Sequence, residues 1–271
     1  MRYRAFIGAI LVASITILGT IGAASADADA KPVAKPSGTP TAHGFHGTRT
    51  VGVLFPPGSV EHTCTASVID SHTGNLLITA AHCISGTGKG YIFAPGYHDG
   101  IEPFGSWEVM GAYGAPGWIA GQAPQRDFAF LAVAPRHLGG RLEQIQSITG
   151  ANQLGSAPVS GERVTVPAYA TGRDDDPVTC TVRVYYHGGF PSFACDPYAD
   201  GTSGAPWLHR TRRGWTVVGI IGGLHQGGCY PWTSYSVAFG AVTGRTQGDA
   251  EMRVDASTFP IAGGDGCSAT P

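Results

Sequence analysis

The feature that most constrains the fold is a series of short apolar runs, each ended by a turn signal. Beginning at Thr50, runs such as TVGVLFPP, ERVTVPAYA and GWTVVGIIGG are rich in Val, Ile, Thr and Tyr and stop at Pro or Gly. Such runs predict strands joined by turns. No helical period of useful length precedes the C-terminal region, where Asp249–Phe259 is an ambiguous helix. With only 13% charged residues and 41 glycines, the chain is predicted to be all-β.

The first residues have the composition of an export signal. Arg2 and Arg4 precede a long apolar stretch that ends in Ala24, Ser25 and Ala26. This order predicts a secretory signal peptide over residues 1–26, cut from a secreted, extracellular protein. The length of the apolar stretch leaves an uncleaved membrane anchor as the alternative. No later segment is long and apolar enough to cross a bilayer, so no membrane contact is expected after cleavage.

Residues 27–47 are rich in Ala, Pro and Gly and have no apolar period, which predicts a linker or a short pro-segment. His43 and His46 within it are interpreted as incidental rather than as metal ligands. The acidic turn RDDDP, Arg173–Pro177, is interpreted as solvated charge rather than as a calcium loop. No metal and no other cofactor is predicted.

Net charge limits the partners of the mature chain. After residue 26 it has 15 Lys and Arg residues against 19 Asp and Glu residues. A protein that binds nucleic acid without sequence preference needs a basic stripe, so no nucleic-acid partner is expected. The remaining length suits one two-lobed unit or two small domains, and we expect a monomer.

The stretch DGTSGAPW, Asp200–Trp207, places a serine among residues with small side chains. Gly201 lies two positions before Ser203, and Gly204 follows it directly. Glycine adopts backbone angles closed to other residues, and its missing side chain lets a substrate carbonyl approach backbone N–H groups. The stretch is therefore a candidate nucleophile loop, although a plain Gly/Ser loop has the same composition.

A second segment, LLITAAHCISG, places His82 at the end of an apolar run and directly before Cys83. The string TAAHC resembles the histidine segment of the trypsin/chymotrypsin-like serine proteases, and GTSGAP resembles their nucleophile loop. The resemblance implies an aspartate that opens a buried strand between the two. The segment QRDFAFLAV supplies Asp127, and the order His82, Asp127, Ser203 is the family's order.

This resemblance implies two six-stranded antiparallel β-barrels packed face to face, with the active site in the cleft between them. The motif matches cover roughly residues 51–240. They imply an N-terminal barrel over 48–135, a connector over 136–156, a C-terminal barrel over 157–262 and a tail over 263–271. In character the chain is most similar to bacterial secreted members, including relatives of glutamyl endopeptidases.

The implied function is a serine endopeptidase that hydrolyses polypeptides through an acyl-enzyme. Ser203 would be the nucleophile, His82 the base that takes its proton, and Asp127 the group that fixes the imidazole tautomer. The backbone N–H groups of Gly201 and Ser203 would form the oxyanion hole. The competing hypothesis is a protease-like binding protein that has lost catalysis, and the complete triad argues against it. An α/β-hydrolase esterase would need a G-x-S-x-G elbow, which is absent around Ser203.

Two positions depart from the animal members of the family. Thr202 stands where those enzymes carry an aspartate that pairs with a freed N-terminal amino group, so activation by that ion pair is not expected. Pro197, six positions before the candidate nucleophile, stands where an aspartate would select Lys or Arg. A trypsin-like preference is therefore not expected.

The remaining candidate substrate-binding residues lie on the strand after the nucleophile loop. Gly222, Gly223 and Leu224 align with the family's substrate-binding Ser-Trp-Gly segment but lack its serine. Pro197 and Ile221 would give the pocket an apolar floor, which favours an apolar or aromatic substrate side chain, with Asp200 at the rim. A glutamate preference stays open because His225 follows Ile221 by four residues.

Six cysteines in a chain with an export signal predict disulfides, and fifteen pairings are possible. The resemblance implies a Cys64–Cys83 bridge behind the candidate catalytic histidine. Cys180 and Cys195 flank a predicted hairpin and are the next pair. Cys229 and Cys267 remain, and a Cys195–Cys229 bridge is the alternative. A zinc site is not predicted, since no CxxC pair occurs.

Overall fold

The computed structural model describes residues 34–172 and 175–267. Internal contacts divide the chain into residues 1–34 and residues 35–271. The predicted signal peptide lies outside the described residues, as do Arg173 and Asp174 of the acidic turn. Among the described helices, none has the length and apolar character that crossing a membrane requires.

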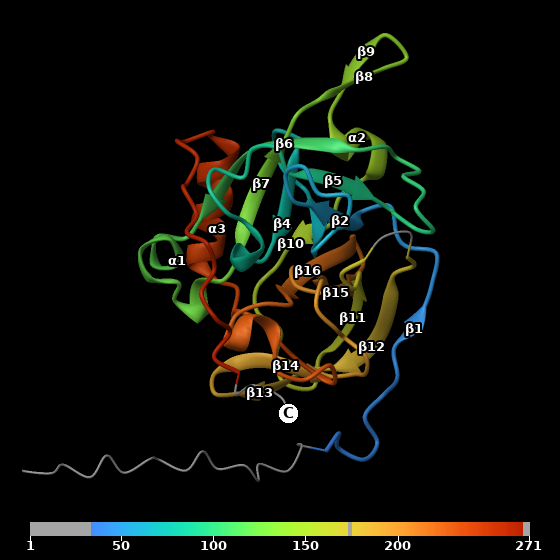
Figure 1. The fold of residues 1–271 in the computed structure, drawn as a ribbon, viewed down its shortest axis with the longest axis vertical. Helices are drawn as coiled ribbons and strands as arrows, with labels where there is room; N and C mark the ends of the chain where they lie inside the picture. Colours follow the sequence, from blue (N-terminus) through green and yellow to red (C-terminus); the bar gives the residue numbers. More distant parts are fainter. Residues whose placement is uncertain (1–33, 173–174, 268–271) are drawn as a thin grey trace, which may run out of the picture. The chain divides into compact units, whose positions relative to one another are not determined.

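The first lobe is a closed barrel of six antiparallel strands. Its order is β2 (Val51–Phe55), β3 (Cys64–Ile69), β4 (Leu76–Thr79), β7 (Ala129–Val133), β6 (Trp107–Gly114) and β5 (Ile92–Pro95). Strands β3, β4 and β7 are buried along their whole length, because both of their faces are covered. The all-β prediction is confirmed, and the predicted first barrel is present (Figure 1).

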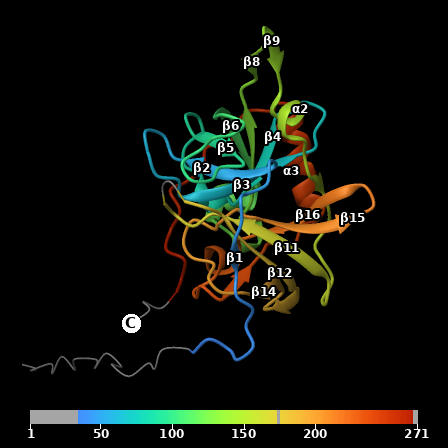
Figure 2. The same ribbon diagram turned by 90° about the vertical axis from the view of Figure 1, so that its right-hand side faces the viewer.

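The second lobe consists of two sheets. The larger has the order β1 (His43–Gly44), β12 (Val178–Arg183), β11 (Arg163–Ala168), β15 (Pro206–Thr211), β16 (Gly214–Ile220) and β10 (Gln153–Leu154), and β10 pairs parallel to β16. The smaller has the order β13 (Tyr185–His187), β14 (Phe190–Ala194) and β17 (Thr233–Tyr235). Figure 2 shows both lobes from the side.

This arrangement differs in detail from the expected second closed six-stranded barrel. The chain passes from the larger sheet to the smaller one at Val184, which lies between β12 and β13. Val184 still exchanges backbone hydrogen bonds with Gly161 and Glu162 beside β11, at 2.7 and 2.9 Å. The ladder of backbone hydrogen bonds between strands therefore divides at Val184. The Cys180–Cys195 disulfide joins the two sheets covalently.

Short helices and one further hairpin complete the set of described helices and strands. They are η1 (Ala81–Cys83), α1 (Pro116–Gly121), η2 (Pro124–Arg126), β8 (Arg136–Leu138), β9 (Arg141–Glu143), α2 (Ile145–Thr149), η3 (Leu224–Gly227) and α3 (Ala241–Glu251). Helix α3 lies against β6 and β7 of the first barrel. It begins before the segment that was predicted as an ambiguous helix. The sequence did not reveal this earlier start, because the buried residues Thr243, Thr246 and Ala250 are too small and polar to give an apolar period.

The described part of the predicted linker contributes to the second lobe. His43 is opposite Thr179 in the β1–β12 pair, and Ala42 N–H donates to the Asp196 carbonyl at 2.7 Å. The Lys35 ammonium pairs with the Asp196 carboxylate at 2.6 Å. Residues 35–44 thus form an edge of the second lobe, although their composition indicated no strand.

The structure contains three disulfides. Cys64 is bonded to Cys83, Cys180 to Cys195 and Cys229 to Cys267. No free cysteine is left among the described residues. The prediction of a disulfide-bonded protein is confirmed, and the alternative Cys195–Cys229 pairing does not occur.

Candidate active site

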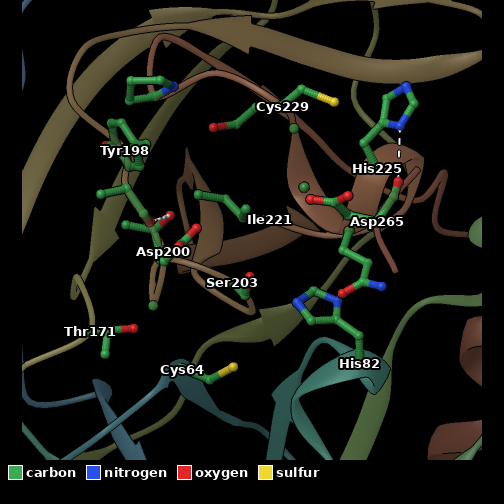
Figure 3. Close-up of a pocket in the computed structure, with 18 of the residues that line it drawn as sticks. Cys64, His82, Thr171, Tyr198, Asp200, Ser203, Ile221, His225, Cys229 and Asp265 are labelled. Atoms are coloured by element: carbon green, nitrogen blue, oxygen red, sulfur yellow. Dashed lines mark hydrogen bonds between the residues drawn. The ribbon is translucent and has the colours of Figure 1, made fainter. Parts of the chain in front are cut away.

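A cavity of about 660 Å³ lies where the two lobes meet, and residues of both line it. His82 and the Cys64–Cys83 disulfide contribute from the first lobe, and Ser203 contributes from the second. Figure 3 shows Ser203 beside the imidazole ring of His82. The structure therefore brings together the candidate nucleophile and the candidate base from segments more than a hundred residues apart in the sequence.

Asp127 is fully buried beneath the histidine and accepts three hydrogen bonds. Its Oδ1 accepts from the backbone N–H of His82 at 2.9 Å, and its Oδ2 accepts from His82 Nδ1 at 2.8 Å. The backbone N–H of Gly223 also donates to Oδ2, at 2.8 Å. A buried carboxylate needs such partners. The arrangement makes Nδ1 the proton-bearing nitrogen of His82 and leaves Nε2 to face the cavity.

The backbone N–H of Gly223, a predicted substrate-binding residue, supports Asp127. The family's serine at this segment is missing, and no motif in the sequence indicated a replacement donor. Gly222 lies next to the same carboxylate, where a Cβ would come within 3.2 Å of Asp127 Oδ2. Because Gly222 has no side chain, the backbone at residues 222–223 passes close to Asp127. The Gly223 N–H can therefore donate to the carboxylate where the family's serine is missing.

The nucleophile loop is held against the first barrel by Thr65, a fully buried residue of β3. The backbone N–H of Thr65 donates to the Ser203 carbonyl at 2.8 Å, and its hydroxyl contacts the Gly201 carbonyl at 3.2 Å. Thr202 is also buried, and its hydroxyl donates to the Ala199 carbonyl at 2.7 Å. Hydrogen bonds thus hold the loop at the position where the animal enzymes use a buried ion pair.

The two expected oxyanion donors point to no protein acceptor. Gly201 has a φ of +93°, and the carbonyl of Asp200 in the same peptide accepts from the Thr171 N–H at 2.6 Å. In the part of the chain that the structure describes, neither Gly201 N–H nor Ser203 N–H donates to another residue. Both donors are therefore available to a ligand in the cavity.

The comparisons with known proteins agree with this geometry. A family described as "Trypsin-like peptidase domain" matches residues 64–220, which include all three candidate catalytic residues. The chain belongs to this family. A search of curated proteins gives no match.

Several solved structures share the fold of this trypsin-like peptidase. The protease Anisep from Arthrobacter nicotinovorans is 19% identical with a TM-score of 0.66, over 78% of this chain and 100% of that one. The thermostable serine protease AL20 from an extremophilic microorganism is 19% identical with a TM-score of 0.64, over 76% and 98%. A Glu endopeptidase is 17% identical with a TM-score of 0.60, over 79% and 98%. The expected chymotrypsin-like fold is confirmed.

Only some of the expected substrate-binding residues of this peptidase line the cavity. Asp200, Ile221 and His225 do, as Figure 3 shows. Gly222, Gly223 and Leu224 are not among the described lining residues, and Pro197 is exposed to solvent outside the lining. The next residue, Tyr198, takes the place expected for Pro197.

Tyr198 is 5% exposed and lines the cavity beside Ala199 and Asp200. Its hydroxyl donates to the Val166 carbonyl at 2.5 Å, so the ring is fixed. Burial raises the pKa of the Tyr198 phenol well above its usual range, which keeps the side chain neutral. The number of residues before Ser203 could not reveal that Tyr198, and not Pro197, faces inward.

The C-terminal tail forms a further wall of the cavity. Asp265 and Cys267 line it, and the Cys229–Cys267 disulfide holds the tail in place. His225 Nδ1 lies 3.0 Å from the Asp265 carbonyl, and the Gln226 amide donates to the Gly263 carbonyl at 2.6 Å. The predicted Cys229–Cys267 pair indicated a fixed tail, but the sequence did not indicate that the tail lines the cavity.

Two groups of possible metal ligands occur at the cavity. One is His82 with Cys64 and Cys83, and the other is His225 with Cys229 and Cys267. All four cysteines are in disulfides, so each group can offer one imidazole nitrogen and no thiolate. These donor sets do not fit zinc, which takes three or four such ligands.

Replacing Gly204 with alanine should destabilise the protein by more than about 2 kcal/mol. Gly204 has a φ of +80°, and a Cβ there would lie 2.2 Å from both the Thr65 carbonyl and Thr79 Oγ1. Urea denaturation measures the effect. The control is Gly248→Ala in α3, where a Cβ meets open space. Since alanine favours the helix interior by about 0.5–1 kcal/mol, this control should not lose stability.

Removing the tail disulfide with Cys229→Ser and Cys267→Ser should lower stability by about 2–4 kcal/mol. We also expect a higher KM for peptides, because Asp265 would no longer be held at the cavity, and a smaller change in kcat. Thermal unfolding and steady-state kinetics measure the two effects. An unchanged KM would show that the tail is a structural support and not a wall of the substrate site.

Proposed function

We propose that this trypsin-like peptidase is a secreted serine endopeptidase that acts through an acyl-enzyme. The observation that carries the proposal is the hydrogen bond of His82 Nδ1 to the buried Asp127, with Ser203 in the same cavity beside the ring. The three disulfides support an extracellular location, where such bonds persist. Polypeptides are the proposed substrates of a monomeric enzyme.

In the proposed mechanism, Ser203 Oγ attacks the carbonyl carbon of the substrate while His82 Nε2 takes its proton. Asp127 holds the ring and stabilises the imidazolium that forms. The N–H groups of Gly201 and Ser203 stabilise the oxyanion, each by about 3–4 kcal/mol in comparable enzymes. His82 then protonates the leaving amine, and water hydrolyses the acyl-enzyme by the same route in reverse.

The proposed preference is for an apolar or aromatic side chain before the cleaved bond. The ring of Tyr198 and the side chain of Ile221 supply apolar surface in the cavity. The same cavity contains the carboxylates of Asp200 and Asp265, which oppose a glutamate side chain. His225, the residue that would favour glutamate, is already engaged with the tail through Nδ1.

Labelling with a fluorophosphonate probe tests the catalytic part of this proposal. We expect the folded, mature protein to be labelled at Ser203 and the Ser203→Ala variant to stay unlabelled. Folded protein that takes no label would contradict the proposal and favour a binding protein without catalysis.

Digestion of a diverse peptide library, read by mass spectrometry, tests the preference. Dominant cuts after Phe, Tyr, Leu or Met are expected. Cuts after Glu that disappear in His225→Ala would replace this preference with a glutamyl one. Cuts after Lys or Arg would contradict both preferences.

A further inference from the structure

A strongly basic patch lies at one end of the larger sheet of the second lobe. Five exposed arginines form it, and we call them the arginine row: Arg163, Arg183, Arg210, Arg212 and Arg213. They are a third of the 15 Lys and Arg residues that follow residue 26, in a chain with 19 Asp and Glu residues. Positive charge is therefore concentrated on one surface of a protein that is acidic as a whole.

The strand register places three of these arginines side by side. Arg163 of β11 is directly opposite Arg183 of β12. On the other side of β11, Thr165 is opposite Leu208 of β15. His209 Nδ1 of β15 lies 3.3 Å from the Arg163 carbonyl, so the next residue, Arg210, lies close to Arg163. Neighbouring strands lie about 5 Å apart, and opposite residues project from the same face. Arg163 and Arg183 thus project from the same face of the sheet, and Arg210 lies at the same end of the neighbouring strand.

The β15–β16 hairpin extends the row. The Arg210 guanidinium lies over the ring of Trp215, 5.0 Å from its centroid, which limits its motion. The turn is closed by the Thr211 hydroxyl, which donates to the Gly214 carbonyl at 3.0 Å. Arg212 and Arg213 are the two residues between them, at the tip of the hairpin, which projects from the sheet in Figure 2.

The charges of the arginine row are not compensated. Across residues 34–172 and 175–267, no carboxylate forms an ion pair with any of the five guanidinium groups. The adjacent acidic residue, Glu162, instead contacts His209 at 2.9 Å and accepts from the Val159 N–H at 2.9 Å. Like charges opposite one another on neighbouring strands destabilise a sheet. The arrangement therefore costs stability unless an anion neutralises it.

We infer that the arginine row binds a flexible linear polyanion that carries phosphate or sulfate groups. Guanidinium groups bind both anions with two parallel hydrogen bonds, and a line of them fits groups that repeat along a chain. Single-stranded DNA also carries repeating phosphate groups, so the test includes it as the competing polyanion. The row lies away from the cavity, since Arg210 follows Ser203 by seven residues of mostly extended chain, roughly 20 Å. A polymer bound there holds the protein in place and leaves the cavity open to peptides.

The test measures binding of fluorescent polyphosphate and fluorescent heparin to the folded, full mature chain at several salt concentrations. The row variant is Arg163→Gln, Arg183→Gln and Arg210→Gln. The control variant is Lys89→Gln, Arg141→Gln and Arg245→Gln, which removes the same charge at exposed positions elsewhere. The row variant should bind at least about 10-fold more weakly at low salt, with a salt slope flatter by about 2 in log–log terms. The control variant should bind like the wild type.

A second variant, Arg212→Gln with Arg213→Gln, changes only the hairpin tip and should weaken binding without disturbing the sheet. Thermal unfolding of every variant shows whether the fold is intact. Binding of polyphosphate alone assigns phosphate, and binding of heparin alone assigns sulfate. The inference is wrong if the wild type binds neither polymer, if row and control variants weaken equally, or if single-stranded DNA binds more tightly than both. Because the readout is binding, these outcomes do not depend on peptidase activity.

Discussion

Ser203→Ala and His82→Ala should each reduce kcat/KM for peptides by about 10⁴-fold or more, and the double variant should be little worse. The reason is that Ser203 gives its proton to His82 as it attacks the substrate. Removing either side chain therefore removes this one proton transfer. The effects of two independent residues would instead multiply. Steady-state kinetics on one peptide substrate with all three variants and the wild type measures the expected pattern.

The fold should survive both substitutions, because His82 and Ser203 are only partly buried and line a cavity. A matched control is Ser257→Ala, which removes a hydroxyl bonded to the Gly114 N–H, outside the candidate site. Hydrolysis near the wild-type rate by either single variant would contradict the assignment of the catalytic residues.

Asp127→Asn should lower kcat/KM by about 10⁴-fold, as the same change does in other serine proteases. All three contacts of the carboxylate are N–H donors, from His82 twice and from Gly223. An amide has one oxygen and one NH₂, so at least one donor would face another donor. The ring of His82 would then turn or take the other tautomer, and Nε2 could not accept the serine proton.

The same variant should lose about 1–3 kcal/mol of stability, because a buried donor is left without an acceptor. Asp249→Asn in α3 is the control for a change from carboxylate to amide, and it should alter neither activity nor stability noticeably. If Asp127→Asn kept most of its activity, the aspartate would be only a structural support. Kinetics and urea denaturation on both variants separate these outcomes.

The sequence predicted the parts of the site that depend on short motifs. TAAHC, the segment that begins at Asp127, and GTSGAP each contain a candidate catalytic residue in a fixed local context, so they could be recognised without coordinates. The first barrel was predictable for a similar reason, since its strands are short apolar runs with clear turn signals.

What the sequence did not predict depends on contacts between distant segments. Tyr198 rather than Pro197 lines the cavity, and the spacing of residues in the sequence does not encode which of two neighbouring side chains faces inward. The tail is held at the site by the Cys229–Cys267 disulfide and by two hydrogen bonds from η3. Strand β1 forms because an edge of β12 is available to a segment with no strand composition of its own.

The hydrogen bonds of Thr65 have a consequence for self-digestion. This residue of the first lobe fixes the loop that carries Ser203, and its neighbour Cys64 is bonded to Cys83 beside His82. A molecule whose lobes separate would therefore lose the alignment of the proposed nucleophile, Ser203, with the proposed base, His82, in the same event that exposes its backbone. Under the proposed mechanism, a copy with separated lobes can be cut but cannot cut others, so only intact molecules are proteolytic.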